Sequence, residues 1–137
     1  MGASEIDVVR DLYAATNERD WDRANGHWAP DAELVIHSSG IRGGNFKGRD
    51  EVARWFGDWF ASFDRDLHFE LTEVRELADG SIYAAAAHRA RGRASGVALE
   101  MSVYWFYELD GDKVALAEHF LDRDEAERRL TERDTSL

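Results

Sequence analysis

His119 is the residue of this chain whose type and setting are best suited to acid–base chemistry. It stands in the last part of a mostly apolar segment, Lys113–Asp122, and an imidazole with an ordinary pKa of about 6.5 exchanges protons near neutral pH. One titratable group does not make a catalytic site, so a buried histidine satisfied by a neighbouring hydroxyl or water is the alternative. The catalytic hypothesis therefore needs further polar groups beside His119.

Turn residues divide the C-terminal half of the chain into three strands that would position such groups. Asp79-Gly80, Ala94-Ser95-Gly96 and Asp110-Gly111-Asp112 are turn signals at the strand boundaries. In chain order, the expected strands are Ile82–Arg91, Val97–Leu109 and Lys113–Asp122. The middle strand contains the β-branched and aromatic run Val103–Tyr107, which is typical of a strand that is apolar on both faces.

The register of the first hairpin decides which polar side chains accompany His119. If the two strands pair about Ser95, Ser102 lies opposite His88 and Tyr104 lies opposite Ala86, on the same face. A different turn exchanges the two faces. In the first register, the polar groups facing a common cavity are His88, Ser102, Tyr104 and His119. We then expect His119 to move a proton and Tyr104 to donate a hydrogen bond to a developing oxyanion.

Helical spacing predicts the elements that precede these strands. Ser4 caps a first amphipathic helix, and Asp20 caps a second that runs from Trp21 to Trp28 and stops before Pro30. A third helix begins near Asp50. Its broad apolar stripe is rich in aromatic residues: Val52, Trp55, Phe56, Trp59, Phe60 and Phe63.

Two more strands and a tail complete the expected order. The strands are Asp31–His37 and Leu67–Leu77, and the glycine-containing segment Ser38–Gly48 is expected to be a loop. The charged segment Asp124–Leu137 is expected to form a terminal helix. Helices followed by antiparallel strands indicate an α+β fold, with about three helices covering one side of a bent antiparallel sheet.

Length and composition indicate a single domain over residues 1–137, with a core of about residues 5–122 and a charged tail over residues 123–137. A chain of 137 residues with 44% hydrophobic content suffices for one core. The net charge of −11 and the lack of a basic run argue against nucleic acid or an anionic membrane as partner. The chain has no cysteine and no apolar segment long enough to span a bilayer, so we expect a cytoplasmic protein.

Several other chemistries have no sequence signal. The histidines lack His-x-His or His-Glu-x-x-His spacing, so we expect no metal site, and no cofactor-binding motif occurs. The segment Gly43–Gly48 fits neither a dinucleotide-binding nor a Walker pattern.

Specific segments resemble a known family. Those that resemble the N-terminal half of SnoaL-like proteins, in the nuclear transport factor 2 superfamily, are Leu12–Asp22, Trp28–Glu33 and Phe46–Val52. Those that resemble its hairpin and final strand are Arg91–Val97, Leu109–Val114 and Phe120–Asp122. The resemblance covers residues 5–128 and implies a cystatin-like, NTF2-like cone enclosing a pocket. Because this fold hosts isomerases, cyclases, hydrolases, dehydratases and binding modules, it does not settle the chemistry.

Carrying the family's catalytic positions onto this chain gives a mixed result. The base, tyrosine and aspartic acid of ketosteroid isomerases fall on Ile36, Leu12 and Tyr104, so that chemistry is not expected. The catalytic aspartate of epoxide hydrolases and SnoaL-type cyclases lies three residues before a terminal Asp resembling Asp122, and this position is His119. An imidazole keeps acid–base capability there but loses the fixed negative charge.

The resemblance also suggests ligand contacts and a partner. His37 ends a strand near the expected mouth of the cone, where a solvated histidine is the alternative to a binding role. The candidate ligand contacts are Leu12, Ile36, His37, Trp55, Phe56, Trp59, His88, Ser102 and Phe106. If Tyr104 and Phe106 face the cone, an outer patch of Val103, Trp105 and Tyr107 would form a homodimer interface of the kind common in this superfamily.

The functional hypothesis is binding of a small, largely apolar organic molecule in an internal pocket. Its enzymatic form is cofactor-free acid–base catalysis, such as isomerisation, cyclisation or dehydration. The alternatives are a dimeric interaction module with a filled cone, and an epoxide-hydrolase-like enzyme with a changed acid–base residue. The sequence leaves open whether the protein is an enzyme.

Overall fold

The fold consists of four helices and six strands in the part of the chain that the structure, a computed structural model, describes: residues 5–37, 44–61, 67–91 and 98–135. In chain order they are α1 (Glu5–Asn17), α2 (Trp21–Gly26), β1 (Trp28–Ile36), β2 (Gly44–Lys47), α3 (Arg49–Ala61), β3 (His68–Glu76), β4 (Ile82–Arg91), β5 (Ala98–Asp110), β6 (Lys113–Phe120) and α4 (Arg123–Arg133). Ser4, Phe63 and the turn about Ser95 lie outside the described residues.

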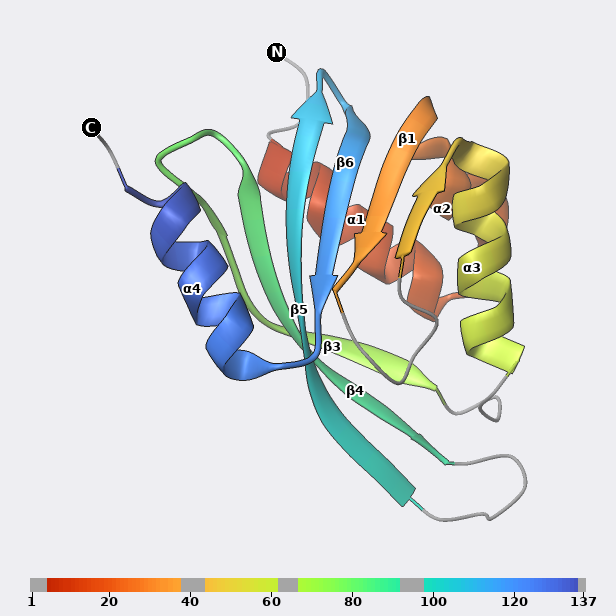
Figure 1. The fold of residues 1–137 in the computed structure, drawn as a ribbon. Coiled ribbons are helices and arrows are strands. Elements are labelled where there is room, and N and C mark those ends of the chain that lie inside the picture. The colour runs from red at the N-terminus through yellow and green to blue at the C-terminus, as the bar shows by residue number, and fades with distance from the viewer. Residues whose placement is uncertain (1–4, 38–43, 62–66, 92–97, 136–137) are drawn as a thin grey trace.

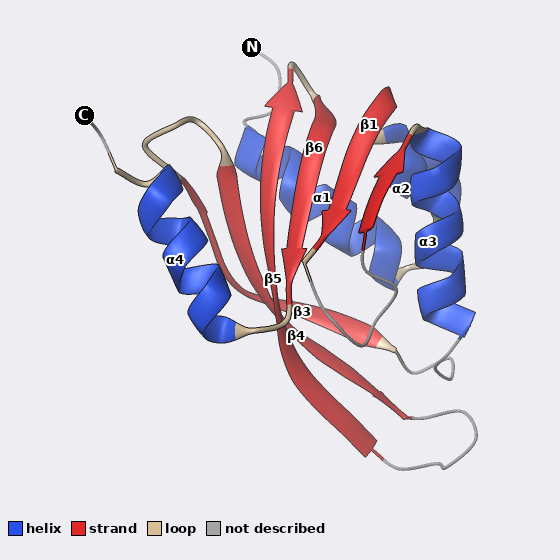
Figure 2. Cartoon of the chain, viewed as in Figure 1, coloured by secondary structure: helices blue, strands red, loops and turns tan. Residues whose placement is uncertain are grey.

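The strands form one curved sheet in the order β2-β1-β6-β5-β4-β3, as Figure 1 shows. All neighbouring pairs are antiparallel except β1 and β6, which run parallel. Helices α1, α2 and α3 lie on one side of the sheet, here called the inner face, and α4 lies on the other, the outer face (Figure 2). The α+β class and the bent sheet with three helices on one side are therefore confirmed.

Element boundaries near Pro30 differ from the prediction. The second helix ends at Gly26, and β1 begins at Trp28 and contains Pro30. The pairing of β1 with β6 is irregular between Trp28 and Glu33, which accommodates a residue that has no N–H to donate. The short edge strand β2 lies in the segment that was expected to be a loop.

The register of β4 against β5 is shifted by one residue from the expected one. His88 pairs with Met101 and Tyr104 pairs with Ala85, and His119 pairs with Trp105 in the next ladder. Because side chains alternate along a strand, this shift moves the odd-numbered positions of β5 to the face that His88 and His119 occupy. The expected common face of His88, Ser102, Tyr104 and His119 is therefore wrong.

The inner face carries the residues that were assigned to an outer dimer patch. Val103, Trp105 and Tyr107 are at most 4% exposed and belong to the main core cluster under the helices. Tyr104 and Phe106 face the other way, toward α4. An interface between two copies of this chain would therefore have to use other residues.

Helix α4 covers the apolar part of the outer face. Its Ala126 and Leu130 join a second core cluster that includes Tyr83, Phe106 and Phe120. The helix begins at Asp122, whose carboxylate accepts a hydrogen bond from the backbone N–H of Glu125 at 3.0 Å, as an N-cap does. The charged tail thus forms the expected helix, and that helix closes the second face of the sheet.

A buried carboxylate on β6 holds α4 in place. Glu118 is 6% exposed and accepts hydrogen bonds from Arg133 at 2.6 and 3.2 Å, and it lies 3.1 Å from Arg129. Burial alone would raise the pKa of Glu118, but the hydrogen bonds from Arg133 and His37 and the charges of both arginines lower it. The carboxylate therefore stays ionised and paired beneath the helix.

Replacing Glu118 by alanine should destabilise the fold because it leaves Arg133, 12% exposed in its side chain, without its closest carboxylate. We expect the free energy of unfolding to fall by about 2 kcal/mol, less than for a fully buried pair because both arginines retain solvent contact. The matched control is Glu127→Ala, which breaks the exposed pair with Arg123 and should cost under about 0.5 kcal/mol. Urea denaturation of both variants measures the difference, and equal losses would contradict the anchoring role.

Candidate functional site

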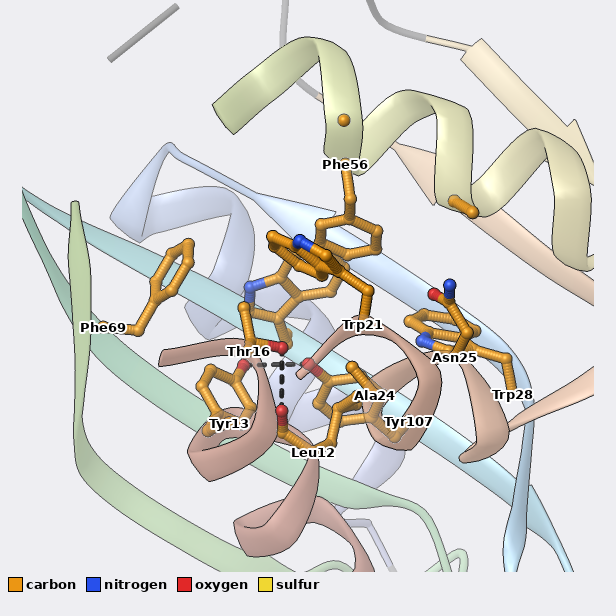
Figure 3. Close-up of a pocket in the computed structure, with 13 residues that line it drawn as sticks. Leu12, Tyr13, Thr16, Trp21, Ala24, Asn25, Trp28, Phe56, Phe69 and Tyr107 are labelled. Carbon is orange, nitrogen blue, oxygen red and sulfur yellow. Dashed lines mark hydrogen bonds between the residues drawn. The ribbon is translucent and has the colours of Figure 1, made fainter. Parts of the chain in front are cut away.

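A cavity of about 200 Å³ lies between the inner face of the sheet and the first three helices. Figure 3 shows it as a hollow whose walls are mostly aromatic. The lining residues are Leu12, Tyr13, Thr16, Trp21, Ala24, Asn25, Trp28, Ala53, Phe56, Gly57, Phe69, Trp105 and Tyr107. They come from α1, α2 and α3 and from strands β1, β3 and β5, so all three inner-face helices contribute to the cavity.

Ring faces dominate the wall that the sheet provides. The rings of Trp105 and Tyr107 are stacked with centroids 5.7 Å apart and planes 8° apart. The ring of Phe56, from α3, is stacked on Trp105 at 5.8 Å and 21°. Trp28 contacts Phe56 at 5.8 Å in a tilted arrangement. Such a wall suits a flat aromatic ring, which gains from offset stacking as well as from burial.

The polar feature of the cavity is a pair of tyrosine hydroxyls. The oxygens of Tyr13 and Tyr107 are 2.8 Å apart, and both tyrosines are buried (Figure 3). One hydroxyl donates to the other, so the second hydroxyl keeps its hydrogen. Within the described parts of the chain neither oxygen has another hydrogen-bond partner. A ligand acceptor in the cavity can therefore receive that hydrogen bond.

Burial keeps both hydroxyls protonated. It raises the pKa of Tyr13 far above 10.0, although the hydrogen bond with Tyr107 acts in the opposite direction. It raises the pKa of Tyr107 as well, and the neighbouring Tyr13 adds to that effect. The pair is consequently a neutral donor over the whole physiological range of pH.

The other polar side chains of the lining are already engaged or lie near α2. The hydroxyl of Thr16 donates to the backbone oxygen of Leu12 at 2.8 Å, within α1. Asn25 lies on α2, beside Trp28 in Figure 3. Among the described residues, the lining contains no histidine, carboxylate, lysine or arginine. The cavity can thus donate a hydrogen bond, but it offers no charged group to a ligand.

Two buried histidines form a separate aromatic cluster on the same face. His119 is 2% exposed and lies 4.4 Å from the ring of Trp105, and Trp55 of α3 is 5.9 Å away. His88 is 1% exposed and stacks on Phe69 at 4.9 Å and 12°. Trp59 contacts both histidines, at 5.3 Å from His88 and 6.5 Å from His119. Neither histidine lines the cavity, although Trp105 and Phe69 do.

Burial makes these imidazoles poor proton acceptors. It lowers the pKa of His119 to about 3, with the nearby His88 and His37 adding to the effect. It lowers the pKa of His88 to about 4. In the described part of the chain, Nδ1 of His119 has no hydrogen-bond partner. Both rings are neutral at pH 7.

The structure separates the predicted site residues into three groups. Leu12 and Phe56 line the cavity. A second group lies in the core of the inner face but does not line the cavity: Ile36, Trp55, Trp59, His88 and His119. The outer-face group comprises His37, Ser102, Tyr104 and Phe106. His119 and Tyr104, the proposed catalytic pair, are therefore on opposite faces.

His37 does not line the cavity; it contacts Glu118 and Phe120. Its Nε2 lies 2.9 Å from a carboxylate oxygen of Glu118. Its ring stacks on Phe120 with centroids 4.4 Å apart and planes 5° apart. It thus belongs to the buried polar group that fixes α4.

Sequence reasoning missed Tyr13 and Tyr107 as polar site residues. Tyr13 was not named as a site residue, and Tyr107 was assigned to the outer patch. The sequence did contain one signal: each tyrosine lies in a segment expected to be buried. A buried phenol usually has a hydrogen-bond partner, so the two tyrosines could have been considered as partners of each other. Their separation of 94 residues hid the pairing.

Metal and membrane sites have no support in the described residues. These residues contain no cluster of three or more histidine, cysteine, aspartate or glutamate side chains that would suit a metal ion. None of the described helices combines the length and the apolar character needed to cross a bilayer.

Comparisons with known proteins agree with the fold. A family profile described as "SnoaL-like domain" matches residues 9–117. A protein of Mycobacterium tuberculosis strain H37Rv, named only as Uncharacterized protein Rv0034, is 27% identical over 120 residues, which span 87% of this chain and 90% of that protein.

Solved structures show the same architecture at low sequence identity. An NTF2-like protein of Burkholderia thailandensis E264 has a TM-score of 0.76 and 21% identity, covering 95% of this chain and 98% of its own. A candidate SnoaL-like polyketide cyclase of Jannaschia sp. CCS1 has a TM-score of 0.75 and 14% identity, covering 96% and 97%. At these identities the likeness shows the fold alone.

The buried histidines predict a specific loss of stability in acid. Their folded-state pKa values lie below the ordinary 6.5, so below pH 6.5 the unfolded chain binds more protons at these two histidines than the folded chain does. The stabilisation is complete above pH 6.5 and is lost as the pH falls toward 4 and 3, by up to about 1.4 kcal/mol per pH unit for each histidine.

Urea denaturation at pH 7 and pH 5 tests this on His119→Gln, which cannot titrate. We expect a smaller loss of stability between the two pH values than in the wild type. His68→Gln, which replaces an exposed histidine on β3, is the control and should keep the wild-type loss. Equal pH dependence in all three proteins would show that His119 titrates normally.

Proposed function

Since this chain belongs to the SnoaL-like domain family and has a cavity between its sheet and its helices, we propose that it binds a small, flat, largely aromatic molecule in this cavity. The ligand carries a hydrogen-bond acceptor, such as a carbonyl oxygen, that meets the Tyr13–Tyr107 hydroxyl pair. The observation that carries the proposal is this buried donor pair at a mostly aromatic wall.

The size of the cavity limits the ligand. An apolar cavity of ~150 Å³ is enough to bind benzene, and the cavity here is about 200 Å³. A ligand of one or two rings fits that space, whereas a molecule of four fused rings would have to extend out of it. An unfilled cavity of this size also favours ligand binding over the alternative of a filled cone that serves only as an interaction module.

The charge of the lining limits the ligand further. Because no ionisable group other than the tyrosines lines the described cavity, a permanently charged ligand would lose its hydration without gaining a partner. A neutral ketone, quinone or ester loses less hydration free energy on entering the cavity, and its carbonyl oxygen can accept a hydrogen bond from the tyrosine pair. The proposed ligand class is therefore neutral aromatic carbonyl compounds.

Binding has more support than catalysis. The tyrosine pair would stabilise negative charge on a carbonyl oxygen, as an oxyanion hole does, but enolisation also needs a base at the ligand. His119, the candidate for that role in both the isomerase-type and the epoxide-hydrolase-type hypotheses, contacts Trp105 and does not line the cavity. The proposed function is accordingly a binding protein for small aromatic carbonyl compounds.

Calorimetric titration with acetophenone and with ethylbenzene, which lacks the oxygen, tests the role of the hydroxyl pair. We expect the wild type to bind acetophenone about fivefold more tightly, since one buried hydrogen bond contributes about 1 kcal/mol. The double variant Tyr13→Phe/Tyr107→Phe should bind both compounds alike. Tyr104→Phe, on the outer face, is the matched control and should keep the preference. A preference that survives the double variant, or a wild type that binds neither compound, would refute the proposal.

The raised pKa of the tyrosine pair predicts how binding depends on alkaline pH. An exposed tyrosine loses its proton near pH 10.0, but burial keeps Tyr13 and Tyr107 protonated above that value. Acetophenone should therefore bind equally well at pH 7 and pH 10, as long as circular dichroism shows that the protein remains folded. Folding itself weakens above pH 10, because tyrosines of the unfolded chain ionise there and those of the folded chain do not. Affinity that falls by half or more at pH 10 in a folded sample would contradict a buried donor pair.

A further inference from the structure

Gly57 occupies a position in α3 where neither the backbone nor the packing requires glycine. It lies inside the helix Arg49–Ala61, where glycine is less favourable than alanine. The described glycines with positive φ are Gly44, Gly48, Gly80 and Gly111, so Gly57 has no left-handed conformation to explain it. A Cβ atom built on Gly57 would meet no heavy atom within 4 Å.

The space beside Gly57 belongs to the cavity. Gly57 and Ala53, one turn earlier on the same side of α3, both line it. Facing them from α2 are Trp21, Ala24 and Asn25, which line it as well. Because Ala24, Ala53 and Gly57 carry small side chains or none, no large side chain from these positions fills the cavity at this edge.

The same edge is the solvent side of the cavity. Gly57 is exposed, and Trp21 is 40% exposed, the one large hydrophobic residue in the described parts of the chain that is so exposed. The ring of Trp21 contacts Phe60 of α3 edge to face at 5.1 Å. The Tyr13 and Tyr107 hydroxyls are buried on the side of the sheet. The cavity therefore runs from the tyrosine hydroxyls inside to a solvent-side edge between α2 and α3.

We propose that ligands enter between α2 and α3 and that Gly57 determines how long a ligand the site accepts. This inference rests on the proposed function, since it assumes that the ligand occupies this cavity. With its carbonyl oxygen at the tyrosine pair, a one-ring ligand lies inside the cavity. A two-ring ligand extends toward Gly57, where the missing side chain leaves room for it. The ligand class that results is aromatic carbonyl compounds of two rings, or of one ring with a flat extension opposite the carbonyl.

Calorimetric titration of acetophenone and 2-acetylnaphthalene into matched variants tests this role. Gly57→Leu should lower the affinity for 2-acetylnaphthalene at least tenfold and the affinity for acetophenone less than threefold, because only the longer ketone reaches the new side chain. Ala53→Leu, at the same edge, is a second variant with the same expected pattern. Gly26→Leu is the control, since a Cβ there also meets nothing within 4 Å and Gly26 does not line the cavity.

Thermal unfolding separates a steric effect from a folding defect. Gly57→Ala should raise the melting temperature, because alanine is the better helix former and the added methyl group meets open space. Wild-type affinity for both ketones in folded Gly57→Leu and Ala53→Leu would overturn the inference and leave the proposed function standing. A wild type that binds acetophenone but not 2-acetylnaphthalene would also overturn the inference alone. A wild type that binds neither ketone would overturn both.

Discussion

The burial of β5 on both of its faces is the constraint on which the rest of the structure depends. Trp105 and Phe106 are neighbours in sequence, point to opposite faces and are 4% and 0% exposed. A sheet with large apolar side chains on both faces needs a layer of helices, here called a cover, on each face. Helices α1 to α3 provide the inner one and α4 the outer one, and the buried Glu118 ties α4 to β6 through two arginines.

The two covers differ in how well they fill the space above the sheet. On the outer face, α4 contributes small and medium side chains that contact large rings of the sheet. On the inner face, the rings of Trp105 and Tyr107 meet helices that carry Ala24, Ala53 and Gly57 at the corresponding edge. Interiors normally pack to crystal-like density, so a cavity of about 200 Å³ beside a helix glycine supports the proposed binding of a ligand.

Burial assigns different roles to the two kinds of polar residue on the inner face. The tyrosine pair keeps one hydroxyl hydrogen beyond the bond between the two oxygens, and burial makes that hydrogen harder to lose. The histidines lie among tryptophan rings, and burial makes their protonation harder. Donation of a hydrogen bond therefore fits this interior better than proton transfer does. The outer-face histidine, His37, serves the anchoring of α4 through Glu118.

The sequence by itself determined the α+β class, most of the helices and strands, and the aromatic stripe of α3, because turn residues, helix caps and apolar spacing act over a few neighbouring residues. It also identified Leu12 and Phe56, two residues of the cavity wall. The boundary at Pro30 was missed because a strand irregularity, which depends on β6, accommodates the proline. Only the tertiary structure decided the faces of β5, because a register shift of one residue exchanges them. This shift places Tyr104 on the outer face, away from His119, and Trp105 and Tyr107 on the inner face. The same holds for the Tyr13–Tyr107 pair, since a contact between residues 94 positions apart arises from packing and leaves no local pattern in the chain.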